Sequence, residues 1–310
     1  MLASTAMADL GFDGKVAIVT GGGGGLGREH AKLLASRGAL VVVNDLGGAV
    51  DGTGGSATPA EQVVAEIGAA GGEAVADAHS VGSPEGGEAI VQTALDAFGR
   101  VDIVVNNAGI LRDKAFHNME PDMIEAVFTV HLKGAFYVTR PAWKLMREQG
   151  YGRVVNTSSS AGILGNFGQA NYGAAKMGLV GLTNVLAIEG ERYNIKANSI
   201  SPIAGTRMTG EVLGKLQEVL DPALVSPMVA FLAHEDCPVS GNIYSVGGGR
   251  VVRFFIGMTE GYLKRDAPLT PEDVRDHFAE IDDTSKFTVP WQATDETFLV
   301  RDLLMKNSDD

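Results

Sequence analysis

The stretch VAIVTGGGGGLGREHAKLLASRG, residues 16–38, decides the fold of this chain. It joins a run of apolar and β-branched residues to a glycine-rich turn, and the turn to an amphipathic helical pattern. Glycines at 21–25 and 27 permit a tight turn, let the backbone approach a pyrophosphate, and leave helix N–H groups free to bind the anion. A flexible linker would lack these ordered flanks, so the stretch predicts a dinucleotide-binding turn.

The strand pattern returns six more times before residue 250, with helical patterns between the strands. Strands are expected at 16–20, 40–45, 73–78, 101–107, 153–159, 195–201 and 242–248. Helices are expected near 26–37, 60–70, 84–98, 120–149, 169–191 and 222–235. Apolar strands that alternate with helices predict an α/β fold: a doubly wound, Rossmann-type, seven-stranded parallel sheet with helices on both faces.

Two segments depart from this rhythm. Residues 46–56, LGGAVDGTGGS, are too long and flexible for a tight turn, and we interpret them as a surface excursion near the cofactor edge, most simply a tolerated insertion. Residues 251–310 are charged and mixed, with a helix start at Thr270 and Pro271. About sixty residues are few for a separate core. We therefore expect one domain, 1–310, in which this extension packs on a core of about 12–250.

Composition excludes several classes of protein. With 38 acidic and 25 basic residues the formal charge is −13, which argues against binding nucleic acid or an anionic membrane. Cys237 is the only cysteine, so an intrachain disulfide and a cysteine metal cluster are excluded, and no metal site is expected. Neither a secretory leader nor a membrane-spanning run is recognisable, and the end MKNSDD is not a peroxisomal address. A cytoplasmic location is expected.

The end of the second expected strand favours one cofactor. Asp45 stands where an acidic side chain can accept hydrogen bonds from the adenosine ribose 2′-hydroxyl. Between Gly38 and Gly99 there is no Lys or Arg that could neutralise a 2′-phosphate. The sequence therefore predicts NAD rather than NADP.

Three residues in the second half of the chain indicate catalysis. Tyr172 and Lys176 stand four apart at the start of a helical stretch, so they project from one face. This spacing would let the ammonium lower the pKa of the phenol and also reach the nicotinamide ribose. The pair alone is common, but Ser159 ends a strand thirteen residues upstream, and all three follow a dinucleotide-binding half.

Together these motifs, with Asn106-Asn107-Ala108-Gly109 after the fourth strand, resemble the short-chain dehydrogenase/reductase family. The resemblance implies that Tyr172 is the general acid/base, that Ser159 polarises the reacting oxygen, and that Lys176 orients the ribose and lowers the phenol pKa. It also implies a set of residues that contact the cofactor. They are Gly21, Gly25, Leu26, Gly27, Asp45, Ser80, Val81, Asn107, Ala108, Gly109, Tyr172, Lys176, Pro202, Ile203 and Thr206.

Two positions depart from the family pattern. His131 stands where many members carry an asparagine that completes a proton relay, and it either substitutes for that asparagine or is a hydrogen-bonded core histidine. After the third strand, where an aspartate often contacts adenine, the chain reads His79-Ser80-Val81. The adenine contact is accordingly left open.

Longer motifs narrow the resemblance. VVVNDLGG, VHLKGAFYVT, GNFGQANYGAAK and LTPEDVRDHF are similar to the dehydrogenase unit of peroxisomal multifunctional enzymes of type 2. This implies NAD-dependent oxidation of (3R)-3-hydroxyacyl-CoA to 3-ketoacyl-CoA in fatty acid β-oxidation. The alternative is a 17β-hydroxysteroid or a steroid side-chain hydroxyacyl-CoA as substrate. The alternative from another class is a non-catalytic NAD-binding sensor, which a broken Ser-Tyr-Lys set would mark.

The resemblance also implies partners. A small-molecule acyl-CoA or steroid substrate is expected, and a homodimer or homotetramer in which helices near 120–149 and 169–191 pack against their copies. Candidate lid residues are Leu164, Phe167, Met208 and Val212. Arg250, Arg253, Lys264 and Arg265 are candidates for binding CoA phosphates, although a solvated charged face is the more common reading.

Overall fold

The computed structural model describes residues 9–55, 58–205 and 219–305. The chain forms two compact units, residues 1–253 and 254–310. The first unit contains the glycine-rich turn and the expected catalytic residues, and the second contains most of the charged extension.

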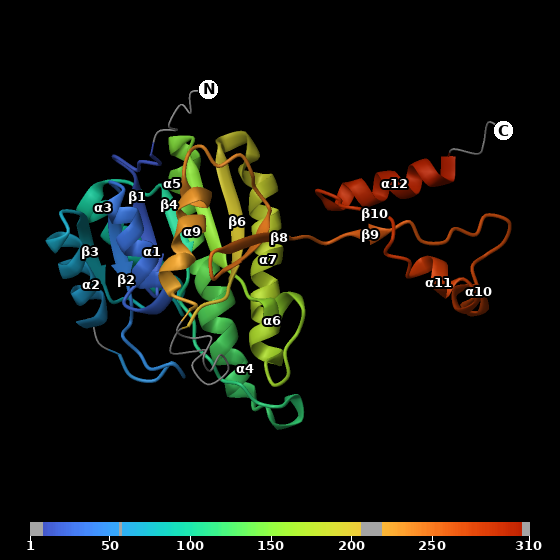
Figure 1. Ribbon diagram of the computed structural model, residues 1–310, viewed down its shortest axis with the longest axis horizontal. Helices are drawn as coiled ribbons and strands as arrows, with labels where there is room; N and C mark the ends of the chain where they lie inside the picture. The colour runs from blue at the N-terminus through green and yellow to red at the C-terminus, as the bar shows by residue number, and fades with distance from the viewer. Residues whose placement is uncertain (1–8, 56–57, 206–218, 306–310) are drawn as a thin grey trace. The chain divides into compact units, whose positions relative to one another are not determined.

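The first unit is built on one eight-stranded sheet with the order β3-β2-β1-β4-β5-β6-β7-β8 (Figure 1). Its strands are β1 Val16–Thr20, β2 Leu40–Asn44, β3 Glu73–Asp77, β4 Ile103–Asn106, β5 Gly152–Thr157, β6 Ile195–Pro202, β7 Ile243–Gly247 and β8 Arg250–Phe254. The pairs from β3 to β7 are parallel, and Ile18 of β1 lies between Val42 and Val104 in register. β2 and β4 lie on opposite sides of β1, so the strand order reverses there. The crevice for a ligand therefore lies at the carboxyl end of β1.

The α/β class, the doubly wound sheet and each of the seven expected strands are confirmed. The sheet contains an eighth strand, β8, which was not expected. β8 was missed because RVVRF carries two arginines and looks like part of the charged extension. Gly248 and Gly249, with φ of 56° and 78°, connect it to β7. A connection of two residues joins antiparallel strands, so the sheet is mostly rather than wholly parallel.

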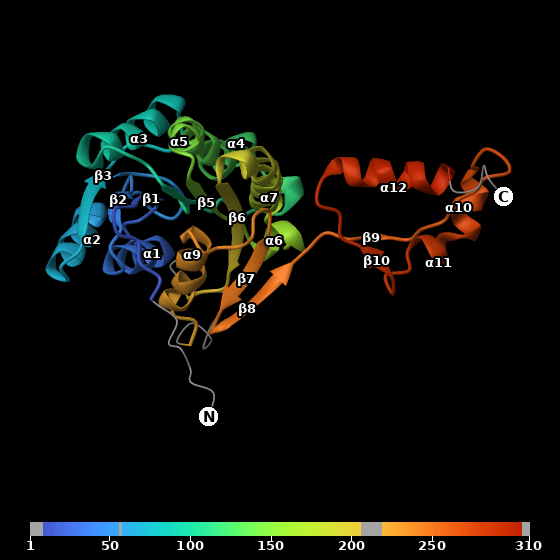
Figure 2. The same ribbon diagram turned by 90° about the horizontal axis from the view of Figure 1, so that it is seen from above.

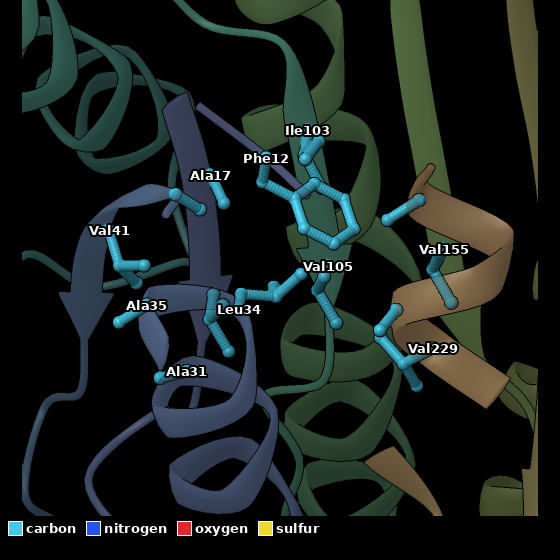
Figure 3. Packing of buried hydrophobic residues seen from close by; sticks show 14 of the residues in the cluster. Phe12, Ala17, Ala31, Leu34, Ala35, Val41, Ile103, Val105, Val155 and Val229 are labelled. Carbon is cyan, nitrogen blue, oxygen red and sulfur yellow. The ribbon is translucent and has the colours of Figure 1, made fainter. Parts of the chain in front are cut away.

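Helices cover both faces of the sheet (Figure 2). One face carries α1 Gly25–Ser36, α2 Thr58–Ala69 and α9 Ser226–Ala233. Figure 3 shows the core beneath them, in which Leu34 and Val229 from the helices meet Val105 from the sheet. The other face carries α3 Pro84–Phe98, α5 Gly134–Gln149 and α7 Ala170–Gly190. The two cores fix the sheet and thereby the crevice at its carboxyl edge.

Local sequence explains where the helices begin and end. In α3 the side chain of Ser83 accepts a hydrogen bond from the backbone N–H of Gly86, and Pro84 occupies the first turn, where its missing N–H costs nothing. Gly99 ends the helix in the left-handed conformation, with φ 75°.

The helix expected over 120–149 is interrupted. It consists of α4 Pro121–Phe128, a π-helical turn Thr129–Lys133, and α5. Such π-turns insert an extra residue into a helix and are frequent at functional sites. His131 lies in this turn. Short helices occur at Phe116–Asn118, Ser160–Ile163 (α6), Glu191–Tyr193 and Pro222–Leu224.

The second unit is small. Strands β9 Met258–Thr259 and β10 Phe287–Thr288 pair antiparallel, and helices α10 Pro271–Asp276, α11 Phe278–Ile281 and α12 Ala293–Met305 complete it. The expected helix start is confirmed, because Thr270 and Asp273 form a reciprocal capping box. None of the described residues in 254–305 is buried. Across the described parts of the chain, no helix is both long and apolar enough to cross a bilayer.

Candidate active site

A cavity of about 610 Å³ lies at the carboxyl ends of the central strands, in the first unit. All but two of the expected site residues line it, so the fold brings together positions from 21 to 203. The two exceptions differ in kind. Gly27 is buried behind the glycine-rich turn, and Thr206 lies outside the described residues.

The glycine-rich turn is too closely packed for side chains. Gly21 has φ 63°, and a Cβ there would lie 2.8 Å from the Cα of Ala108. A Cβ on Gly22 would lie 2.9 Å from the Cγ1 of Val43. The turn is therefore a cradle of bare backbone at the start of α1, where N–H groups are free to bind a phosphate. This geometry fits a dinucleotide.

Asn107 braces the turn from the end of β4. Its side-chain Nδ2 donates to the carbonyl oxygens of Thr20 and Gly21 at 3.0 and 3.1 Å. Its backbone N–H and that of Ala108 donate to Thr20 Oγ1 at 3.0 and 3.1 Å. These bonds tie β4 to β1 and hold the cradle in one conformation.

Asp45 follows β2 and faces the cradle. Its Oδ2 accepts a hydrogen bond from the backbone N–H of Gly23 at 2.8 Å, and its Oδ1 accepts one from Gly47 at 2.7 Å. A carboxylate oxygen has two acceptor sites, so Asp45 can still accept from a ribose hydroxyl.

The cations of α1 both pair with one acidic residue on α2. Glu66 Oε2 lies 2.6 Å from Arg28 Nη2 and 3.0 Å from Lys32 Nζ. The hydrogen bond from Lys32, together with the contact to Arg28, holds the pKa of Glu66 below its usual value. These two cations are thus occupied rather than available for a 2′-phosphate.

Asp77, a residue the sequence analysis did not single out, organises the loop after β3. Its buried carboxylate accepts hydrogen bonds from Asn44 Nδ2 at 2.6 Å, Thr93 Oγ1 at 2.7 Å and the backbone N–H of His79 at 3.0 Å. Burial opposes the charge, but the hydrogen bonds, led by that of the His79 ring, whose Nδ1 lies 2.8 Å from Asp77 Oδ2, lower the pKa of Asp77. The loop residues 79–81 that it fixes line the cavity.

Ser159, Tyr172 and Lys176 converge on the cavity. Ser159 caps α6 after β5, with its Oγ accepting from the backbone N–H of Ala161 at 3.2 Å, and its side chain acts on Tyr172 so as to lower the pKa of the phenol. Lys176, one turn along α7, places its Nζ 5.5 Å from the centre of the Tyr172 ring. The same Nζ donates to the carbonyl oxygen of Thr157 at 2.5 Å.

The pKa values of this group differ from the sequence expectation. Burial raises the pKa of Tyr172 above its ordinary value, the hydrogen bond with Ser159 opposes the rise, and the charge of Asp113 adds to it. Burial also lowers the pKa of Lys176 to about 7. The expected lowering of the phenol pKa is therefore not what this structure shows, because removal from water outweighs the hydrogen bonding.

His131 has features of both interpretations left open above. Its Nε2 contacts the backbone N and O of Ile110 at 3.0 and 2.8 Å, as a core histidine would. Its Nδ1 has no hydrogen-bond partner among the described residues, and the ring meets that of Tyr172 edge-on, with centroids 5.1 Å apart. Burial, with a contribution from the charge of Lys176, lowers the pKa of His131 well below its ordinary value. The ring is therefore neutral at pH 7.

The cavity is also lined by residues that were not expected at the site. Residues 46, 48–50 and 52, taken for a surface excursion, lie on its wall together with Ile110 and Leu111. Of the lid candidates, Leu164 lines the cavity, Phe167 is 91% exposed and does not, and Met208 and Val212 lie outside the described residues.

Two of the four basic candidates already have partners within the second unit. Arg250 and Arg253 lie on β8, whereas Lys264 and Arg265 belong to the second unit. Lys264 pairs with Asp273 at 2.6 Å, and Arg265 Nη2 donates to the carbonyl oxygen of Leu303 at 2.7 Å. The structure therefore contradicts the idea that Lys264 is available for a CoA phosphate.

Known proteins resemble this chain over most of its length. The family model described as short chain dehydrogenase matches residues 15–216. Peroxisomal multifunctional enzyme type 2 of Mus musculus is 50% identical over 300 residues, which are 96% of this chain and 40% of that enzyme. A hydroxyacyl-CoA dehydrogenase of Mycobacterium tuberculosis is 42% identical over 260 residues, which are 77% of this chain and 79% of the relative. The chain thus spans less than half the length of the mouse enzyme.

Solved structures agree. The full-length peroxisomal multifunctional enzyme type 2 of Drosophila melanogaster has a TM-score of 0.81 and 40% identity, covering 96% of this chain and 50% of that one. A 7α-hydroxysteroid dehydrogenase complexed with NADH and 7-oxo glycochenodeoxycholic acid has a TM-score of 0.70 and 30% identity, covering 77% of this chain and 95% of that one.

These names contradict one expectation. The mouse enzyme and relatives from other organisms are named as peroxisomal enzymes, so the cytoplasmic location expected from the sequence is wrong. That expectation rested on the interpretation of the two ends of the sequence and on the single cysteine, which does not separate one reducing compartment from another.

Proposed function

The chain belongs to the short-chain dehydrogenase family, and on that premise we propose that it oxidises (3R)-3-hydroxyacyl-CoA to 3-ketoacyl-CoA with NAD, as a step of fatty acid β-oxidation. The observation that carries the proposal is the convergence of Ser159, Tyr172 and Lys176 on the cavity that also contains the glycine cradle. The mouse and Drosophila relatives, and the relative named as a hydroxyacyl-CoA dehydrogenase, support the substrate class.

The chemistry follows from the positions of three side chains. When bound, the oxidised nicotinamide cofactor accepts a hydride from the carbon that carries the hydroxyl group. Tyr172 Oη takes the proton of that hydroxyl, and Ser159 Oγ donates a hydrogen bond to the substrate oxygen as it becomes a carbonyl. Lys176 is held by Thr157, and burial lowers its pKa to about 7; when it is protonated, its positive charge stabilises the phenolate.

The direct test compares substrates. Purified protein with NAD is given a medium-chain (3R)-hydroxyacyl-CoA, its (3S) epimer or a 17β-hydroxysteroid, and NADH formation is followed by absorbance. We expect turnover of the (3R) thioester only, because one fixed pair of hydroxyl-binding groups selects one face of the carbinol carbon. Turnover of the steroid alone would replace the acyl-CoA with a sterol substrate, and no turnover of any alcohol would contradict the proposal.

The preference for NAD has its own test. Asp45→Ala should lower the ratio of kcat/KM with NAD to that with NADP by about tenfold or more, because it removes both a ribose acceptor and the charge that repels a 2′-phosphate. Asp45→Asn is the matched control, since it keeps a side-chain oxygen for the N–H groups of Gly23 and Gly47 and removes only the charge. An unchanged ratio in Asp45→Ala would contradict the assignment.

We also propose a homodimer or homotetramer. On α7 the apolar residues Met177, Val185 and Ile188 are exposed. Together with Gly181, where an added Cβ would meet nothing within 4 Å, they follow a helical spacing along one face. Light scattering at micromolar concentration should give a mass of at least twice 32.4 kDa, and Val185→Glu should reduce it. A wild-type monomer would contradict this proposal.

The extension is proposed to belong to the same single domain, 1–310. The family model ends at residue 216, but the similarity to the mouse enzyme covers 96% of the chain and therefore includes most of residues 251–310.

A further inference from the structure

The segment 46–55, called the strap below, leaves the end of β2 and returns to α2 (Figure 1). Because β1 lies between β2 and β4 in the sheet, the loops that follow β2 and β4 flank the carboxyl end of β1. A ligand in the crevice at this end must lie between these two loops.

The strap reaches across to the segment that follows β4. The backbone N–H of Leu111 donates to the carbonyl oxygen of Val50 at 2.9 Å, and Arg112 Nε donates to the carbonyl oxygen of Asp51 at 3.0 Å. Gly52 packs so closely that a Cβ there would lie 3.2 Å from two side-chain atoms of Ile110. The two loops are thus joined over the end of β1.

The strap also has structure of its own. Thr53 accepts a backbone hydrogen bond from Ala49 at 2.8 Å, and the carboxylate of Asp51 accepts from the backbone N–H and the hydroxyl of Thr53 at 3.0 and 2.7 Å. At its root, the backbone N–H of Gly47 is bound by Asp45, the residue that also binds the glycine turn. A turn closed by four hydrogen bonds is a defined element rather than a flexible excursion.

The inner side of the strap belongs to the cofactor cavity. Leu46, Gly48, Ala49, Val50 and Gly52 line it together with the glycine cradle. Since the segment joins the two loops on either side of the crevice, a dinucleotide held by the cradle would be enclosed between the cradle and the strap.

We propose that the strap encloses the bound cofactor and that Arg112 is the positioning residue that latches it. This inference rests on the proposed nicotinamide cofactor. Release of the cofactor requires the contacts at Val50 and Asp51 to open, so the latch slows dissociation more than it affects hydride transfer. The guanidinium suits this task because it keeps its charge and donates from a fixed planar group.

The test measures dissociation of NADH by stopped-flow fluorescence. Arg112→Ala should raise the dissociation rate constant by about tenfold, the change that loss of one hydrogen bond from a charged donor produces. Arg112→Lys, which keeps a charged donor, should restore part of the difference. Lys114→Ala is the matched control, because Lys114 is an exposed cation two residues along whose side chain makes no hydrogen bond or ion pair with the described residues of the strap, and it should leave the rate unchanged.

A second variant tests the strap independently of Arg112. Gly52 has φ 86°, so Gly52→Ala strains the strap and presses on Ile110, and it should also speed NADH release. Hydrogen exchange gives a further readout: NADH should protect residues 46–55 in the wild type and protect them less in Arg112→Ala.

The outcomes separate the two proposals. Dissociation rates within about twofold of wild type in both variants, with unchanged thermal stability, would overturn the proposal that the strap encloses the cofactor. The proposed dehydrogenase activity would not be affected by that result. A wild-type protein that does not bind NADH would overturn both. Binding of NADH without oxidation of any hydroxyacyl-CoA would overturn the proposed substrate. The rates of NADH dissociation would still decide the proposal on the strap.

Discussion

Tyr172→Phe is expected to lower kcat for alcohol oxidation by about 10³-fold while changing the Kd for NADH by no more than about twofold. The substitution removes the hydroxyl that we propose takes the substrate proton and that interacts with Ser159. The ring that remains still meets His131 edge-on and still packs beside Ala175 and Val127. The loss should therefore appear in turnover and not in stability or cofactor affinity.

The control is a tyrosine outside the cavity. Tyr193→Phe removes a hydroxyl that is bonded to Arg147 on the exposed surface, and it should leave kcat near the wild-type value. Turnover of Tyr172→Phe within about tenfold of wild type would contradict its role as the base.

The same residue determines the sign of the pH dependence. In the proposed mechanism oxidation requires the phenolate, and burial raises the pKa of Tyr172, so kcat/KM for the alcohol should rise with pH up to that pKa. A profile that falls with pH in the alkaline range would require a different base.

The sheet, and the placement of Ser159, Tyr172 and Lys176 at one cavity, were predictable because their signals are local. Strands buried on both faces leave continuous apolar runs, and VAIVT and IVVN are examples. Tyr172 and Lys176 were predictable for the same reason, since four residues of helix bring them to one face. The glycine-rich turn and Ser159 were predictable because each follows a recognisable strand in the chain.

Features that depend on tertiary contacts were not predictable. The π-turn at Thr129–Lys133 has no signature in the sequence, and it places His131 against Tyr172. The strap looked like a tolerated insertion because its contacts are with Leu111 and Arg112, some sixty residues away. The raised pKa of Tyr172 follows from burial, and the four-residue spacing of Tyr172 and Lys176 contains no information about burial.

Gly27→Ala is expected to give the largest loss of stability among the glycine-turn substitutions, about 3 kcal/mol in the free energy of unfolding. A Cβ at Gly27 would lie 2.1 Å from the carbonyl oxygen of Gly21 and 2.5 Å from Asn107 Nδ2. Neither neighbour can give way cheaply, because one is backbone and the other braces Thr20 and Gly21 through two hydrogen bonds. α1 must therefore separate from the turn, and the Kd for NADH should rise by at least about tenfold.

Denaturant unfolding and an NADH titration measure the two effects of Gly27→Ala, and Gly68→Ala is the matched control. Gly68 also lies inside a helix, α2, but a Cβ there would meet nothing within 4 Å. Alanine should therefore stabilise that helix by about 0.5–1 kcal/mol through the lower entropy of the unfolded chain. Opposite signs for the same chemical change would show that the close approach of α1 to the turn, and not helix propensity, dictates glycine at position 27. A Gly27→Ala protein with wild-type stability and NADH affinity would contradict the cradle geometry on which the cofactor assignment depends.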